Sequence, residues 1–477
     1  MTPTTHRRPR AVTPVRPLSW RVAATLLALA PLGLCDAAWS QRVTGADRAA
    51  QRIAPPPLPA DTMARLMDGE MQARIRALVE EVLHRTLAEP PATVVVDPAG
   101  MREVIERALR AVRPDGRFEA AQLDQLAQRQ IAIYDPVKKI VALGAGGLAS
   151  VGDSERGPVL RMLYAQALAS AVIDRELGLP AFAAGETAEI AMTRRMLSEG
   201  LSVTVRDRVA GRLGIDAFAR QYRALLPGMF DQGSGPSLER SIYGTGRIVV
   251  EALWNGKGID ATWSFLAGKP TSVKELGRVI PRSRAVKSLQ AALDRLLPAK
   301  DWVRARAPAP PSSMIAGIKG LAAADRNRIA ERAVAAETLG FSGRQGESIL
   351  FTSVRLADAE AADAFEKMLA AMPSALAADF GAKGVRVEVT RTARRGGADP
   401  GIEFAVATLA LAQDDPTAKP TVLMSARRGT EVIGVTFSNV VVPDATVQRA
   451  LDALAESLGA EAELGLEDAP DAPPTGG

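Results

Sequence analysis

Histidine and cysteine, the residue types that most often carry catalysis or hold a metal ion, are nearly absent from this chain. Its 477 residues include two histidines, His6 and His84, and one cysteine, Cys35. His84 falls on a predicted N-terminal helix as an ordinary surface residue. The sequence therefore argues against a Ser-His-Asp triad, a Cys-His dyad and a histidine-rich metal site. Asp and Glu are plentiful, but no spacing singles out a pair for acid–base chemistry.

One stretch nevertheless has the layout of a zinc-dependent hydrolytic site. A catalytic zinc needs three protein ligands, and two histidines at i and i+4 put both rings on one helix face. A Glu beside the first histidine takes the proton of the metal-bound water, and a second helix can supply the third ligand. In this chain the corresponding positions hold Gln166, Ala167, Ser170 and Glu199. Since an amide and a hydroxyl are poor zinc ligands and Ala167 accepts no proton, we predict a site without metal, cofactor or catalytic residue.

Two helices must position these residues. Apolar spacing predicts one helix over 160–177 and a second over 185–211, joined by the turn at 178–180. Upstream, the pattern predicts helices over 63–87 and 98–112, a strand at 92–97 and a hairpin formed by 131–134 and 140–143. The glycine-rich run 144–150 is followed by further turn residues instead of opening a helix, so we read it as a flexible loop and not as a phosphate-binding loop.

Four motifs in order carry a family resemblance. They are the hairpin AIYDPVKKIVA at 132–142, the helix QALASAVIDRELGL at 166–179, the helix MLSEGLSVTV at 196–205 and the stretch PTSVKELGRV at 270–279. Residues 79–281 are thereby similar to a family of exported bacterial HExxH metallopeptidases of the gluzincin type. The resemblance implies a mainly helical domain in which Glu199 matches the third zinc ligand and Arg278 replaces a family histidine. This sequence departs from the family's motif at the histidine zinc ligands and at the general base.

Several of these positions have a plain structural reading as well. Glu199 either lines a residual cleft or is a solvated helix carboxylate. Tyr243 either lies at the mouth of that cleft or belongs to the core of a helix. The degenerate-site hypothesis requires Gln166, Ser170 and Glu199 to converge.

The charge of the chain lies mainly at its N-terminus. The formal net charge is +5, and residues 1–37 carry five arginines against Asp36. The remainder is too weakly charged for a strong electrostatic footprint on nucleic acid, so we expect no nucleic-acid partner.

The same N-terminal segment has the layout of a secretory signal. An Arg-rich region precedes an apolar run of about 13 residues, shorter than the roughly 20 that a membrane-spanning helix needs. Cleavage fits after Ala37 or Ser40. We expect a periplasmic or extracellular protein with no integral membrane span after processing. The alternatives are an uncleaved N-terminal anchor and lipidation at Cys35.

Composition and pattern together predict an α+β fold in two domains. The expected boundaries are a signal at 1–37, a linker at 38–62, a pseudo-metallopeptidase domain at 63–303, a linker at 304–316, an α+β domain at 317–464 and a disordered tail at 465–477. The α+β domain is expected as a small sandwich in which four or five antiparallel strands are covered by helices.

These expectations favour a non-catalytic role, the binding of a peptide or protein partner through the old cleft or the second domain. The first alternative is a carboxylate-based hydrolase that uses the inherited cleft. The second is a structural envelope protein in which the α+β domain is the interaction module.

Overall fold

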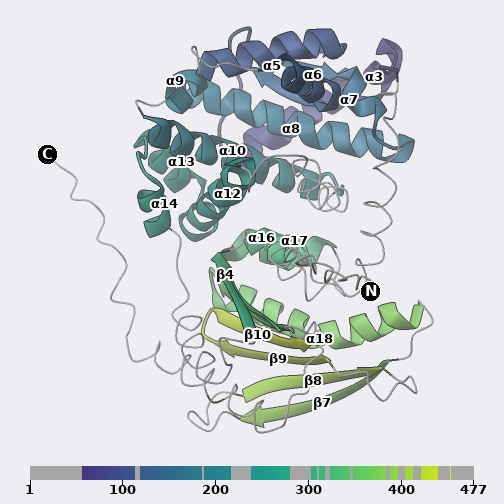
Figure 1. Cartoon of the computed structure of the whole chain (residues 1–477), viewed down its shortest axis with the longest axis vertical. Helices are drawn as coiled ribbons and strands as arrows, with labels where there is room; N and C mark the ends of the chain where they lie inside the picture. Colours follow the sequence, from purple (N-terminus) through teal and green to yellow (C-terminus); the bar gives the residue numbers. More distant parts are fainter. Residues whose placement is uncertain are drawn as a thin grey trace, which may run out of the picture.

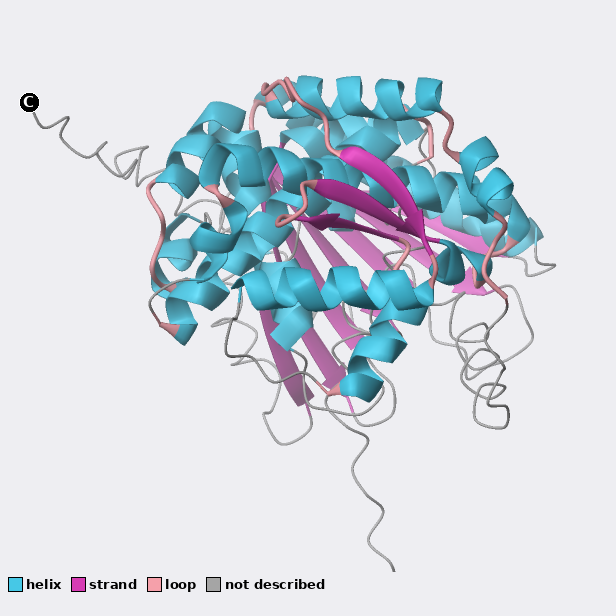
Figure 2. Ribbon diagram, turned by 90° about the horizontal axis from the view of Figure 1, so that it is seen from above, coloured by secondary structure: helices cyan, strands magenta, loops and turns pink. Residues whose placement is uncertain are grey.

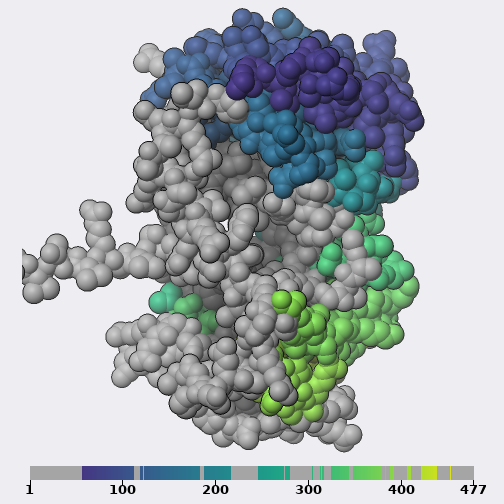
Figure 3. Space-filling model, turned by 90° about the vertical axis from the view of Figure 1, so that its right-hand side faces the viewer, coloured from purple at the N-terminus to yellow at the C-terminus, as the bar shows by residue number. Residues whose placement is uncertain are grey.

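The structure, a computed structural model, describes residues 56–112, 119–184, 187–215, 238–279, 302–308, 311–316, 323–343, 348–382, 387–395, 403–411, 421–438 and 452. The expected signal at 1–37 and tail at 465–477 lie outside these residues. The architecture is α+β, with a helical N-terminal part and a large antiparallel sheet (Figure 1). Figure 3 shows the purple-to-blue residues of the N-terminal part stacked above the green residues of the sheet part.

Helices dominate the N-terminal part. They are α3 (Ala60–Leu66), α4 (Gly69–Leu83), α5 (Pro98–Val112), α6 (Ala120–Arg129), α7 (Ala145–Ala149), α8 (Asp153–Leu177), α9 (Leu179–Ala184), α10 (Ala188–Arg212), α12 (Leu238–Lys257), α13 (Ile259–Ala267) and α14 (Val273–Val279). Asp68 caps α4, since its side chain accepts a hydrogen bond from the backbone of Met71, and Thr187 caps α10 in the same way through Ile190. The exposed His84 ends α4 in the left-handed conformation.

A small sheet lies among these helices (Figure 2). Its strands are β1 (Ala92–Val96), β2 (Ala132–Asp135) and β3 (Ile140–Gly144), in the order β1-β3-β2. β1 runs parallel to β3, and β2 pairs with β3 as the antiparallel hairpin that the sequence predicts.

The glycine-rich run that follows β3 is not a flexible loop. Residues 145–149 form the buried helix α7. A Cβ on Gly144 would lie 2.1 Å from the carbonyl oxygen of Gln130, and one on Gly147 would lie 2.5 Å from the same atom. These glycines therefore permit a close backbone approach, which a pattern-based reading cannot distinguish from flexibility.

The sheet part is larger than the sequence predicts. Its helices and strands are β4 (Trp302–Pro308), α16 (Pro311–Ala316), α17 (Ala323–Arg332), β5 (Ala333–Gly343), β6 (Ser348–Leu356), α18 (Ala359–Ala382), β7 (Val387–Arg395), β8 (Glu403–Leu411), β9 (Thr421–Arg428) and β10 (Glu431–Ser438). The described strands form one seven-stranded antiparallel sheet in the order β4-β5-β6-β10-β9-β8-β7. α18 lies along one face of the sheet (Figure 1), where Phe365 and Met368 pack with Val354 and Val432.

The sequence pattern does not predict two features of this part. The interval 304–316, expected as a linker, contains most of β4 and all of α16. The strand β5, with the sequence AVAAETLGFSG, was not expected, because its alanines and glycines carry a weak strand signal. Pairing with β4 on one side and β6 on the other places it in the sheet regardless of this propensity.

The helical part and the sheet part are held together by polar contacts of α12. The Asn255 side-chain amide donates to the carbonyl oxygens of Ala330 at 3.1 Å and Ala333 at 2.7 Å. Arg208 of α10 lies with its guanidinium carbon 4.0 Å from the centre of the Trp254 ring and donates to Asn255. Buried hydrogen bonds of this kind fix the orientation of the elements they join.

No helix within the described residues is long and apolar enough to cross a membrane.

Candidate functional site

The helix pair that the sequence predicts is present, and α8 packs directly against α10. Arg194 near the start of α10 lies over the ring of Phe182 in α9, which follows α8 immediately. Arg206 near the end of α10 contacts Gln166 in the middle of α8. Since the start of α10 lies beyond the end of α8 and its end lies beside the middle of α8, the two helices run antiparallel.

The three α8 positions of the candidate site have structural roles. The Ser170 hydroxyl donates to the carbonyl oxygen of Gln166 at 3.2 Å, one turn earlier in the same helix. Ala167 is 4% exposed and packs in the main hydrophobic core. The Gln166 side-chain oxygen accepts a hydrogen bond from Arg206 Nη1 at 3.1 Å.

The partner of Gln166 is a buried cation. Arg206 is 2% exposed, and its Nε lies 3.1 Å from Asp207 Oδ1. Its Nη2 is buried and has no hydrogen-bond partner among the described residues. The position follows Glu199 by seven residues, two helical turns, so both residues start from the same face of α10.

Arg206 begins a chain of buried charges that crosses from α10 to α12. Arg247 Nη2 lies 2.8 Å from Asp207 Oδ2, and Arg247 Nε lies 2.6 Å from Glu251 Oε1. We call Arg206, Asp207, Arg247 and Glu251 the buried ion chain. Burial lowers the pKa of the Arg247 guanidinium, but the charges of Glu251 and Asp207 outweigh it and raise the pKa above its ordinary value. Arg247 therefore stays protonated.

The buried ion chain ends on the sheet part. The Ser312 hydroxyl, at the start of α16, donates to Glu251 Oε1 at 2.5 Å and accepts from Arg247 Nη2 at 2.5 Å. The Ser312 backbone N–H donates to Glu251 Oε2 at 3.1 Å. Both carboxylate oxygens of Glu251 are thus engaged, and its 2% exposure keeps water from competing with these contacts.

The donor set does not fit the zinc ion that the resemblance implies. Zinc prefers imidazole, thiolate and carboxylate ligands. The oxygen of Gln166 already accepts from a guanidinium, and the Ser170 hydroxyl donates to a backbone carbonyl. The described residues contain no group of three or more His, Cys, Asp or Glu side chains that could hold a metal ion. The chemistry of the helix pair is that of a cation held by neutral and anionic acceptors.

The remaining predicted site residues lie on three other helices, α10, α12 and α14. Glu199 lies half-buried in the middle of α10, and its carbonyl oxygen accepts from the Ser202 hydroxyl. Arg278 is exposed in the last turn of α14. Tyr243 belongs to α12, but its side chain lies outside the described part of the structure. Of the predicted site residues, Gln166 makes a side-chain contact within the helix pair, and its partner is Arg206.

A second buried polar cluster anchors the end of α8. The Tyr134 hydroxyl of β2 donates to Asp174 Oδ2 at 2.7 Å, and Lys139 Nζ lies 2.5 Å from the same oxygen. The Leu179 backbone N–H donates to Asp174 Oδ1 at 2.9 Å. Burial first, and then the hydrogen bond and charge of Asp174, raise the pKa of Tyr134 above its ordinary value. Tyr134 and Lys139 of the hairpin therefore hold the end of α8 in place through Asp174.

The hairpin is also fixed from within. Asp135 is fully buried, and its Oδ1 accepts from the backbone N–H groups of Val137 at 2.9 Å and Lys138 at 3.1 Å. Its Oδ2 lies 2.6 Å from Nε of Arg107 on α5. An aspartate that bonds its own turn in this way is a strong local signal for the reversal.

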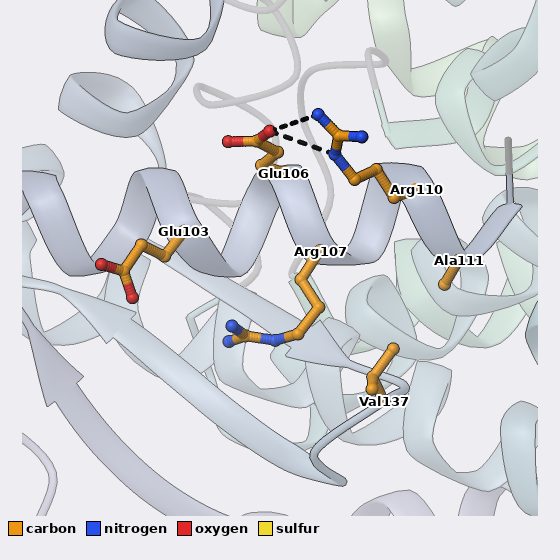
Figure 4. A pocket seen from close by; sticks show the side chains of 6 residues that line it. All are labelled: Glu103, Glu106, Arg107, Arg110, Ala111 and Val137. Carbon is orange, nitrogen blue, oxygen red and sulfur yellow. Dashed lines mark hydrogen bonds and ion pairs between the residues drawn. The ribbon is translucent and has the colours of Figure 1, made fainter. Parts of the chain in front are cut away.

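Beside this hairpin the surface has an open hollow. It is lined by Glu103, Glu106, Arg107, Arg110, Ala111 and Val137. Figure 4 shows Glu106 and Arg110 turned toward each other, with Arg110 Nη2 2.7 Å from Glu106 Oε1. Since Arg107 is paired with Asp135, most of the charge in the hollow is already neutralised locally.

The sequence-based reading did not select Arg206, Asp207, Arg247 or Glu251. Two signals could have found them. Arg206 lies at i+7 from Glu199, two turns along the same helix face, and Arg247 and Glu251 have the i, i+4 spacing of a helical ion pair. Neither signal says that the charges are buried, which depends on the packing of α12 against α10.

The chain matches no protein-family model, no curated protein and no solved structure.

Proposed function

We propose that this chain is an exported protein whose helical part is a catalytically inactive, gluzincin-like pseudo-metallopeptidase domain, and that it acts by binding a peptide or protein partner. The observation that carries the proposal is the contact between Gln166 and Arg206. The position that matches the first zinc ligand is engaged by a buried guanidinium.

The environment of the other two α8 positions supports the absence of hydrolysis. A general base must reach the proton that it removes, either directly or through a water molecule. Ala167 offers a methyl group that is 4% exposed, and the hydroxyl of Ser170 bonds the helix backbone. Neither residue can activate water.

The polar contacts between the helical part and the sheet part support a binding role. The buried ion chain, Ser312 and Asn255 join the helical part to the sheet part through several short hydrogen bonds. A binding surface on two parts that are held together in this way loses little conformational freedom when a partner binds. We propose a peptide or protein partner because the resemblance is to a peptidase family.

The test combines binding with metal and activity assays on the purified full chain. Screening of a random peptide library should yield peptides that bind saturably and are recovered intact. Copurified zinc at about one equivalent per chain, together with peptide hydrolysis that a chelator abolishes, would sink the proposal.

A carboxylate-based hydrolase is the second candidate. The contact that favours it is that of the Ser312 hydroxyl with Glu251 Oε1 at 2.5 Å, because a carboxylate can take a proton from serine. It ranks second because Arg247 and the Ser312 backbone engage the same carboxylate.

Assays against peptide, ester and glycoside substrates separate the two candidates. Glu199→Gln reports on the inherited cleft, and Glu251→Gln reports on the Ser312 contact. Glu189→Gln, an exposed glutamate in the first turn of α10, is the matched control. Activity that disappears in one of the first two variants while circular dichroism shows that variant to be folded, and that survives in the control, would favour the enzyme.

Export is part of the same proposal, and the N-terminal segment supports it. Edman sequencing of the mature protein from a bacterial periplasm should begin at residue 38 or 41. Recovery of the uncleaved chain in the cytoplasm would contradict it, and a lipid on Cys35 would establish the lipidated alternative.

A further inference from the structure

We infer that Arg206 is a built-in cation that takes the place of a metal ion in the α8–α10 helix pair. It joins the two helices through Gln166 and excludes a divalent cation from the space between them. This inference rests on the proposed function, because it concerns the same degenerate site, and it explains how the pair keeps its packing without a metal.

The contacts of Arg206 are those of a cross-link. Its guanidinium reaches from α10 to the side-chain oxygen of Gln166 on α8 at 3.1 Å. Its Nε bonds Asp207 of its own helix at 3.1 Å. A long charged side chain that is 2% exposed is unfavourable unless its contacts compensate for the loss of water. The protein therefore keeps a charge in this place at a free-energy cost that a purely apolar helix pair would avoid.

The unpaired Nη2 donor of Arg206 indicates that its surroundings favour a hydrogen-bond acceptor over a cation. Nη2 is buried and has no hydrogen-bond partner within the described residues. An N–H donor attracts acceptors, and the positive charge of the guanidinium that carries it repels cations. The carboxylate of Asp207 faces Arg206 through Oδ1 at 3.1 Å and Arg247 through Oδ2 at 2.8 Å, so both of its oxygens already lie against a guanidinium. A second cation in this place would therefore meet the Arg206 guanidinium and compete with two arginines for the oxygens of Asp207.

The position of Arg206 also explains how α8 and α10 stay packed together without zinc ligands. Gln166 is long enough to present an oxygen to a guanidinium, whereas a histidine in its neutral form presents one ring nitrogen as an acceptor and the other as a donor. Gln166 and Arg206, 40 residues apart in sequence, thus form one matched pair that links α8 to α10.

Zinc binding by restored ligands tests the exclusion. Gln166→His, Ala167→Glu and Ser170→His are combined in the full chain, once with Arg206 retained and once with Arg206→Met. Zinc affinity is measured by competition with a chromophoric chelator. We expect the variant without Arg206 to bind zinc on the order of 100-fold more tightly, because a buried like charge has been removed. Equal affinity in the two backgrounds, or no binding in either, overturns the exclusion.

Thermal unfolding tests the cross-link without any metal. Arg206→Met and Gln166→Met should each lower the melting temperature, and the double variant should lose less than the sum because each single change already breaks the shared contact. Arg206→Lys should recover part of the loss, since it keeps the charge and loses the planar fork. Arg195→Met, on a half-buried arginine of the same helix, is the control. Additive losses, or unchanged melting of Arg206→Met, overturn the cross-link.

If the restored chain without Arg206 does not fold, as circular dichroism would show, Arg206→Gln replaces Arg206→Met in the zinc experiment. Peptide binding enters neither measurement. Failure of both tests therefore leaves the proposed binding role intact, whereas zinc-dependent hydrolysis by the unaltered chain would overturn that role.

Discussion

Gly200 of α10 and Gly246 of α12 lie in direct backbone contact. A Cβ on Gly200 would lie 2.2 Å from the carbonyl carbon of Gly246, and one on Gly246 would lie 1.6 Å from the carbonyl oxygen of Met196. Distances this short leave no room for any side chain at either position. The two helices therefore cross next to Glu199, and this crossing brings Arg247 within reach of Asp207.

Gly246→Ala should destabilise the protein by about 3 kcal/mol or more, at the upper end of overpacking effects, because the obstacle is helix backbone. Denaturant unfolding followed by circular dichroism measures the change. Gly277→Ala in α14 is the control, since a Cβ there meets nothing within 4 Å. It should leave stability unchanged or raise it by up to about 1 kcal/mol. Equal effects of the two changes would refute the close crossing.

Glu251→Gln should destabilise the protein by about 3–5 kcal/mol, because Arg247 would remain buried without its full counter-charge. Ser312→Ala should weaken the same contacts and speed hydrogen exchange in α16, which Ser312 ties to α12. Asp61→Asn is the control. Its ion pair with Arg65 is about 70% exposed, so its loss should change stability by less than about 1 kcal/mol. Unchanged exchange in α16 for both variants would show that Ser312 does not couple the two parts.

Stability should fall at alkaline pH through Tyr134. Its pKa is raised in the folded state above the ordinary value of 10.0, so the folded state holds the proton more tightly than the unfolded chain. The corresponding stability is fully present below pH 10.0 and is lost as the pH rises above that value. Tyr134→Phe should therefore show a shallower decline in the free energy of unfolding between pH 9 and about 11. Parallel curves for the variant and the unaltered chain would contradict the role of this hydroxyl.

Asp135→Ala should cost more stability than Asp135→Asn. Asparagine keeps an oxygen for the backbone N–H groups of Val137 and Lys138, whereas alanine leaves both without this acceptor. Either change removes the charge opposite Arg107. We expect the alanine variant to lose about 1–3 kcal/mol beyond the asparagine variant. Urea unfolding of the pair decides this, and equal losses would mean that the ion pair with Arg107 alone carries the effect.

Local patterns predict most of the elements. The apolar periodicity marks α8 and α10, and the alternation of apolar residues marks the strands β6, β9 and β10. The predicted helix at 98–112 and the hairpin of β2 and β3 are confirmed. The local pattern does not predict β5, whose alanines and glycines carry a weak strand signal, or β4, most of which lies in the interval expected as a linker.

The residues of the candidate site also divide into those that local pattern predicts and those that tertiary packing brings together. The sequence by itself determined that Gln166 and Ser170 occupy one helix face and that histidine is nearly absent, because these facts depend only on residue type and helical period. Only the tertiary structure decided that Arg206 meets Gln166 and that Arg247 and Glu251 are buried between α10 and α16. Such contacts join residues about 40 to 60 positions apart. The contact of Arg247 with Asp207 depends in addition on the two glycines that let α12 approach α10, a long-range packing event that no local pattern encodes.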